Sequence, residues 1–81
     1  MGKEFKLQDI VMISQSSDYY DENNDSNPRD IEGEVNRIDS DGTIYVKWPN
    51  YDDLNTYSNY DLLLIRRFVK QEEKHNNYSR F

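Results

Sequence analysis

Acidic and amide side chains recur at alternate positions after residue 20, in the spacing closest to a metal-binding pattern in this chain. The residues at positions 1, 3, 5, 7 and 12 of a calcium loop of the EF-hand type would be Asp21, Asn23, Asp25, Asn27 and Glu32. That loop needs glycine where Ser26 stands, Pro28 occupies its eighth position, and no helix is predicted on either side. We therefore interpret the segment as a solvated acidic loop and expect no metal and no other cofactor.

Catalytic groups are sparse. His75 is the only histidine, and the chain has no cysteine. Ser16 and Ser17 have no base close in the sequence, so no set of nucleophile, base and orienting group can be assembled. Carboxylates are numerous, but none has the apolar sequence context that marks a general acid. We expect a protein without enzymatic activity.

Tyrosines form a second group with chemical potential, because their rings supply contact area and their hydroxyls supply hydrogen bonds. Tyr19 and Tyr20 fall in the acidic loop, and Tyr57 and Tyr60 flank the last predicted turn. Each of them either covers the core or faces a ligand, and we expect two or more to form an exposed patch. The predicted partner-binding residues are Tyr19, Tyr20, Asp21, Glu22, Asp25, Trp48, Tyr57 and Tyr60.

Trp48 has two interpretations, as a core anchor or as the floor of an exposed groove. It is in phase with Ile44 and Val46 along the strand predicted for residues 43–48. This phase favours the core.

Length and charge narrow the function further. With 81 residues the chain forms one small domain, and without cysteine it has no disulfides, which is compatible with the cytoplasm. The net charge of −6 argues against binding a phosphate backbone. The charge is uneven, because residues 14–41 carry nine acids and two arginines, whereas residues 62–81 carry five basic and two acidic residues. The longest apolar run, residues 62–65, is far shorter than the roughly 20 residues of a membrane helix.

Short stretches rich in β-branched and aromatic residues predict an all-β fold. The expected strands cover residues 9–13, 31–38, 43–48, 54–57 and 62–66, with the last closing against the first. Asp41-Gly42 predicts a hairpin turn, and residues 58–61 predict a 3₁₀-like turn. Gly33, inside a strand, indicates a bulge, a bend or a close backbone approach. Residues 14–30 are expected to be a loop without regular structure.

Several residues recur at the spacing of a known family. They are Gly33-x-Val35, Gly42, Tyr45-Val46-x-Trp48, Asn50, Asn55-x-Tyr57 and Asp61-Leu62. The pattern resembles that of the mind bomb/HERC-type SH3-like domains, and it is shared by small bacteriophage proteins that carry an Asn-Pro like Asn27-Pro28. It departs after Trp48, where the family has Asn-Gly and this chain has Asn50-Tyr51. The resemblance implies a peptide- or protein-binding module.

We therefore predict an SH3-like five-stranded β-barrel over residues 1–66, with a long acidic first loop. A helical or disordered tail is expected over residues 67–81. The expected function is that of a cytoplasmic interaction module, a monomer or weak dimer, which binds a partner protein with a basic surface. If the bacteriophage resemblance holds, that partner is a host protein.

Two alternatives remain open. An acidic mimic of nucleic acid would block a host enzyme that binds DNA or RNA, or the basic residues after position 65 would bind nucleic acid directly. A protein-binding module predicts that Tyr20→Ala or Tyr57→Ala abolishes partner capture while the fold survives.

Overall fold

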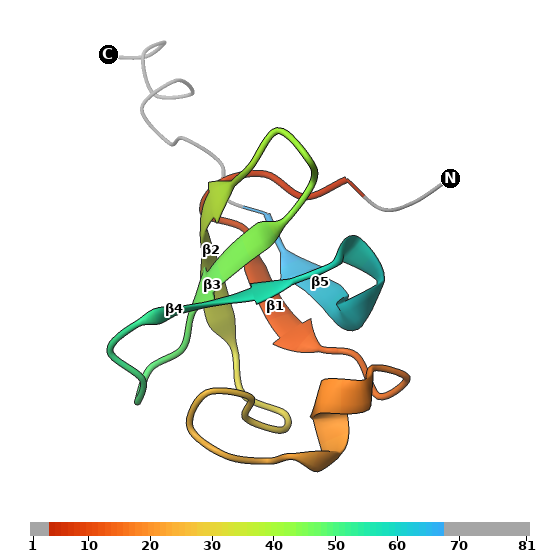
Figure 1. The fold of residues 1–81 in the computed structure, drawn as a ribbon, viewed down its shortest axis with the longest axis vertical. Helices are drawn as coiled ribbons and strands as arrows, with labels where there is room; N and C mark the ends of the chain where they lie inside the picture. Colours follow the sequence, from red (N-terminus) through yellow and green to blue (C-terminus); the bar gives the residue numbers. More distant parts are fainter. Residues whose placement is uncertain (1–3, 68–81) are drawn as a thin grey trace, which may run out of the picture.

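The chain folds as a single antiparallel sheet of five strands, seen in a computed structural model that describes residues 4–67 (Figure 1). The strands are β1 (Ile10–Ile13), β2 (Gly33–Ile38), β3 (Ile44–Lys47), β4 (Leu54–Tyr57) and β5 (Leu62–Arg66). All five predicted strands are confirmed, each with ends within two residues of those expected. The predicted tail, including His75, lies outside the described residues except for Arg67. Within those residues, no helix is long and apolar enough to cross a membrane.

The strand order is β4-β3-β2-β1-β5, so β4 and β5 lie at the two edges. The predicted pairing of the last strand with the first is confirmed, with Ile13 opposite Leu62 and Met12 opposite Leu63. No hydrogen-bonded ladder joins β4 to β5 in the described sheet. The prediction of a closed barrel is therefore corrected to five antiparallel strands in one sheet that hydrogen bonds do not close.

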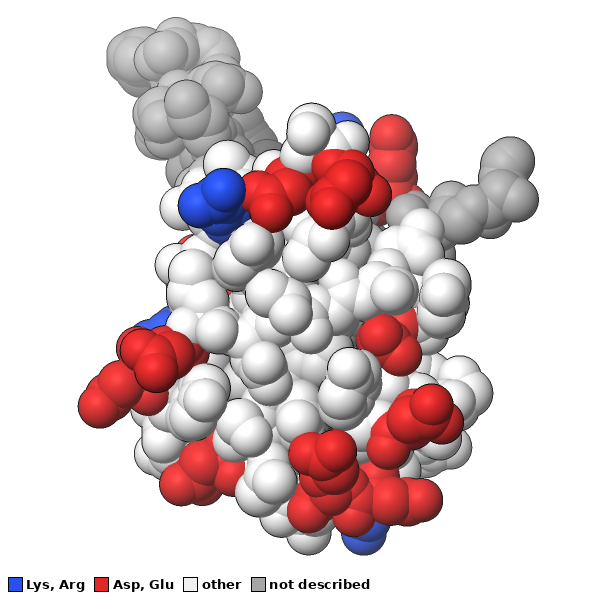
Figure 2. Space-filling view, in the orientation of Figure 1, with Lys and Arg blue, Asp and Glu red and all other residues white. Residues whose placement is uncertain are grey.

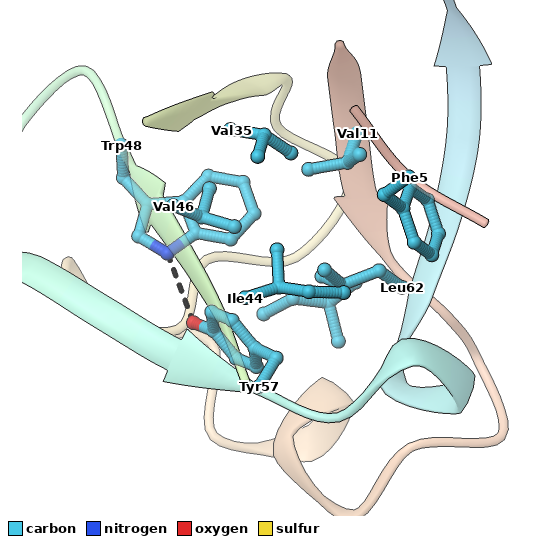
Figure 3. Close-up of a cluster of buried hydrophobic side chains, with 9 residues drawn as sticks. Phe5, Val11, Val35, Ile44, Val46, Trp48, Tyr57 and Leu62 are labelled. Atoms are coloured by element: carbon cyan, nitrogen blue, oxygen red, sulfur yellow. Dashed lines mark hydrogen bonds between the residues drawn. The ribbon is translucent and has the colours of Figure 1, made fainter. Parts of the chain in front are cut away.

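One apolar cluster lies against the inner face of this sheet, with side chains from all five strands (Figure 3). Its members are Phe5, Val11, Ile13, Val35, Ile44, Val46, Trp48, Tyr57 and Leu62. In β3, Ile44 and Val46 are buried while Tyr45 and Lys47 are half-buried, so the predicted alternation is confirmed. Trp48 is 0% exposed, which settles its role as a core residue.

Gly33 owes its place to a close approach between β2 and Trp48. A β-carbon added to Gly33 would lie 2.6 Å from Cζ3 of Trp48 and 2.8 Å from Cγ1 of Val46. Real β-carbons do not come this close to other side chains, so only glycine fits without movement of the indole. Of the three predicted explanations for this glycine, the close approach is confirmed.

The predicted turns are also present. Gly42 has φ of +92°, and its N–H donates to the carbonyl of Asp39 at 2.9 Å. The 3₁₀ turn η2 (Asn59–Asp61) connects β4 to β5. The Ser58 N–H donates to Oδ2 of Asp61 at 3.1 Å, which closes this turn.

A buried carboxylate ties the two ends of the described chain together. Asp9 is 0% exposed, and it accepts hydrogen bonds from the Lys6 N–H at 2.8 Å and from Arg67 Nε at 3.2 Å. The Arg67 guanidinium also donates to the carbonyl of Glu4 at 3.0 Å. These bonds give the buried charge the partners that it requires.

Candidate partner-binding surface

The connection between β1 and β2, residues 14–32, carries most of the predicted surface and is more structured than expected. It contains a 3₁₀ turn, η1 (Asp18–Asp21), which starts where the Ser17 hydroxyl accepts the Tyr19 N–H at 3.1 Å. The same hydroxyl donates to Oδ1 of Asp61 at 2.9 Å, so the turn is fastened to η2. The prediction of a loop without regular structure is wrong at this point.

Asn27 anchors the middle of this loop. Its residue surface is 6% exposed, and its Nδ2 donates to Oε1 of Glu22 at 2.8 Å. Its Oδ1 accepts from Asn55 Nδ2 at 2.9 Å and contacts the Tyr57 hydroxyl. Its backbone N–H donates to Oδ1 of Asn24 at 2.8 Å. The Asn27 amide thus joins the acidic loop to β4, together with the Ser26 carbonyl, which accepts from Asn55 Nδ2 at 2.7 Å.

The Tyr57 hydroxyl lies at the centre of the same network. It accepts from Trp48 Nε1 at 2.9 Å, as Figure 3 shows, and lies 3.0 Å from the carbonyl oxygen of Ser26. Burial raises the pKa of Tyr57 to about 12, although the hydrogen bonds from Trp48 and Asn55 oppose the shift. The phenol therefore stays protonated over the physiological range and acts as a fixed link between core and loop.

Two of the predicted partner-binding residues are consequently core residues. Trp48 is 0% and Tyr57 3% exposed, so neither side chain offers surface to a partner. Tyr57 lies opposite the buried Ile44 in the pairing of β3 with β4, and it is the only buried residue of β4. Tyr57→Ala would open a cavity in the core, so it is a test of folding and does not isolate partner binding.

The other predicted residues reach solvent to different degrees. Asp21, Glu22 and Asp25 are exposed, and Tyr60 is 75% exposed. Tyr19 and Tyr20 are half-buried and pack against the core cluster.

Tyr19 and Tyr20 are held by different contacts. The Tyr19 ring meets the Tyr57 ring edge-on, with 5.5 Å between their centroids. The Tyr20 ring lies under the Arg29 guanidinium at 4.8 Å, and its hydroxyl donates to Oδ1 of Asp30 at 3.1 Å. Partial burial, followed by the hydrogen bond to Asp30, raises the pKa of Tyr20. Both rings are therefore fixed before any partner arrives.

Acidic side chains surround an uncharged central area on the face shown in Figure 2. Few of them are neutralised in the loop, where Arg29 forms one contact with Asp21 at 3.5 Å and the Asp21 side chain stays 92% exposed. The loop thus presents carboxylates beside fixed aromatic rings. We define the acidic-aromatic surface as the exposed acids and half-buried tyrosines of this loop, Asp21, Glu22, Asp25, Tyr19 and Tyr20.

The calcium-like spacing does not converge on one point. Asn27 turns inward to Tyr57, and Glu32 forms an ion pair with Arg66 at 3.0 Å. The seventh and twelfth positions of the pattern are thus engaged elsewhere. Over residues 4–67, no group of three or more acidic, histidine or cysteine residues is arranged to hold a metal ion.

Asn27 and Asn55 hold the loop on the sheet, and neither is among the predicted partner-binding residues. The only signal for them in the sequence is their place in the resemblance pattern, as Asn27-Pro28 and Asn55-x-Tyr57. Comparison of the chain with known protein families, with curated proteins and with solved structures finds no match. No family is therefore identified for this chain, and the resemblance rests only on the residues quoted for it.

Proposed function

We propose that this protein is a small non-enzymatic module with an SH3-like fold that binds a basic segment of a partner protein in the cytoplasm. The fold assignment is supported by the strand order, with β5 beside β1 and every other neighbour consecutive in the chain. It is also supported by the long connection from β1 to β2 and by the 3₁₀ turn before β5.

The observation that carries the function is the anchoring of an acidic loop through a buried polar network. Asn27 and Tyr57 hold the loop from inside, while Asp21 and Asp25 remain exposed on its outer side. A loop that is ordered before binding loses less conformational entropy when a partner docks. Carboxylates on such a loop attract a basic partner and set its orientation.

The tyrosines supply the apolar part of the same contact. Tyr19 and Tyr20 are rigid and half-buried, so they can be covered without ordering a long side chain. Tyr60 stands on η2, which the Ser17–Asp61 hydrogen bond joins to the loop. We include Tyr60 as a third aromatic contact for the partner.

Capture experiments with the whole chain test this function. Partners retained from a lysate are identified, and one purified partner is titrated against the wild type and against a Tyr20→Ala, Asp21→Asn, Asp25→Asn triple variant. Circular dichroism checks the fold of both. We expect the triple variant to fold and to lose at least tenfold in affinity; an unchanged affinity would refute the proposal.

A competition experiment with the same purified partner distinguishes a protein-binding module from an acidic mimic of nucleic acid. A mimic occupies the DNA or RNA site of its target, so duplex DNA or RNA added in excess displaces it. We expect the partner to stay bound in the presence of competing nucleic acid, and displacement would favour the mimic.

A further inference from the structure

A separate hollow of about 320 Å³ opens where the beginning of β2 meets the end of β3. Ile10 and Pro49 supply its accessible apolar lining, whereas Gly33 and Trp48 border it but are buried. Glu32, Glu34 and Lys47 complete its wall. We call it the β2–β3 groove; none of its residues belongs to the acidic-aromatic surface.

The charged side chains Glu34 and Lys47 of this groove differ in whether they have hydrogen-bond partners. Glu34 lies opposite Lys47 in the antiparallel register, a position where opposite charges usually pair. The Lys47 ammonium instead donates to the carbonyls of Trp48, at 2.9 Å, and Tyr51. The Glu34 carboxylate therefore has no hydrogen bond or ion pair to any residue between positions 4 and 67.

Glu32, the second acid of the groove, already binds an arginine side chain of this chain. Its two carboxylate oxygens accept from the Arg66 guanidinium, at 3.0 and 3.3 Å, in a two-point contact. Planar guanidinium groups form such paired bonds, and their weak hydration lets them lie on apolar surface. The free Glu34 carboxylate, beside the apolar side chains of Ile10 and Pro49, offers the same chemistry to a group from outside the chain.

We infer that the β2–β3 groove binds an arginine side chain of a partner protein, with the guanidinium on Glu34 and the methylene stem over Ile10 and Pro49. The inference rests on the proposed function, because it assumes a basic partner, and it adds a second contact point with a defined residue type. Arginine fits better than lysine because the compact ammonium of lysine neither spans a carboxylate with two bonds nor sheds water easily.

The test is a titration of the ¹⁵N-labelled chain with a capped glycine-arginine-glycine tripeptide, followed through its amide resonances. We expect saturable shifts at Gly33, Glu34 and Trp48. Glu34→Gln should weaken binding about three- to fivefold, as expected for loss of one exposed ion pair. Asp41→Asn removes the same charge from the turn between β2 and β3, at the opposite end of these strands from the groove, and should leave the tripeptide affinity unchanged.

Three results would overturn the inference: no saturable shifts in the groove, equal binding by Glu34→Gln, or equal binding of a glycine-lysine-glycine tripeptide. Shifts confined to residues 18–25 and abolished by Asp25→Asn would also reject the groove, while leaving the proposed acidic-aromatic surface intact. Conversely, a partner whose affinity is unchanged by the loop variants but lowered by Glu34→Gln would refute the acidic-aromatic surface and support the groove. Thermal unfolding of each variant confirms that the fold is unchanged.

Discussion

The strands and the acidic loop are fixed by different kinds of contact. Val35, Val46 and Leu62 are 0% exposed in an apolar cluster that spans the sheet. The loop has no comparable cluster of its own. Tyr19 and Tyr20 pack against the cluster of the sheet, and Ser26 and Asn27 are held by hydrogen bonds to Asn55 and Tyr57. A segment rich in Asp, Asn and Ser can thus be ordered by a few buried polar bonds, although its composition is typical of a mobile loop.

Substitution of Gly33 should destabilise the sheet and should have the largest effect of the changes below. Gly33→Val adds a branched side chain where a single β-carbon would already collide with Trp48 and Val46. We expect a loss of about 3 kcal/mol or more in the free energy of unfolding, measured by urea denaturation. Gly42→Asn is the control, because a β-carbon there meets nothing within 4 Å and Asn tolerates positive φ. A near-neutral Gly33→Val would contradict the close approach.

High pH should weaken the link between core and loop. Because the pKa of Tyr57 is raised to about 12 in the folded chain, the folded state keeps the phenolic proton at pH values where the unfolded state loses it. This stabilisation is complete below pH 10 and is lost as the pH rises from 10 through 12. We expect the wild type to lose about 2–3 kcal/mol more than Tyr57→Phe over this range. Parallel curves for the two proteins, followed by urea denaturation, would contradict the buried phenol.

Removal of the Asn27 amide should release the loop at a smaller cost. Asn27→Ala removes one acceptor of Asn55 Nδ2 and of the Tyr57 hydroxyl, which keep the Ser26 carbonyl as their other contact with the loop. We expect a loss of about 1–2 kcal/mol in the free energy of unfolding, with faster amide exchange confined to the loop. Asn50→Ala, at an exposed turn residue, is the matched control. Equal effects of the two substitutions would show that Asn27 is not an anchor.

The outer side of the loop should tolerate substitution without loss of stability. Asp25 is exposed and makes none of the hydrogen bonds that link Asn27 to Asn55 and Tyr57. Asp25→Asn should therefore change the free energy of unfolding by less than about 0.5 kcal/mol. Its effect should instead be a several-fold weaker affinity for the basic partner, measured by calorimetry. Substantial destabilisation by Asp25→Asn would contradict the division between anchored and exposed sides.

The sequence was sufficient to predict the strands but not the network that fixes the loop. Alternation in β3 placed Ile44 and Val46 inside, and the same phase placed Trp48 in the core. Asn27 meets its partners 28 and 30 residues further along the chain, so no local pattern announces the contact. Its amide also carries no hydrophobic signal in a segment full of similar residues.

Tyr57 was predicted to bind a partner but is buried, because hydrophobicity does not indicate which side chain of β4 faces the core. In this strand Leu54 is 40% exposed, whereas Tyr57 is 3% exposed. Hydrophobicity alone would bury the leucine, and the tyrosine is buried because its hydroxyl finds partners in Trp48 and the loop. The acids of the candidate surface are exposed, whereas the ring of Tyr57 points inward.

Backbone dynamics of the acidic loop test the central claim, that it is ordered before any partner binds. ¹⁵N relaxation of the free protein would give order parameters for the amides of residues 24–27 and, for comparison, of β3. We predict values near 0.85 in both, as for rigid backbone, and a marked drop at residues 24–27 alone in Asn27→Ala. Values below about 0.6 at residues 24–27 in the wild type would contradict the account.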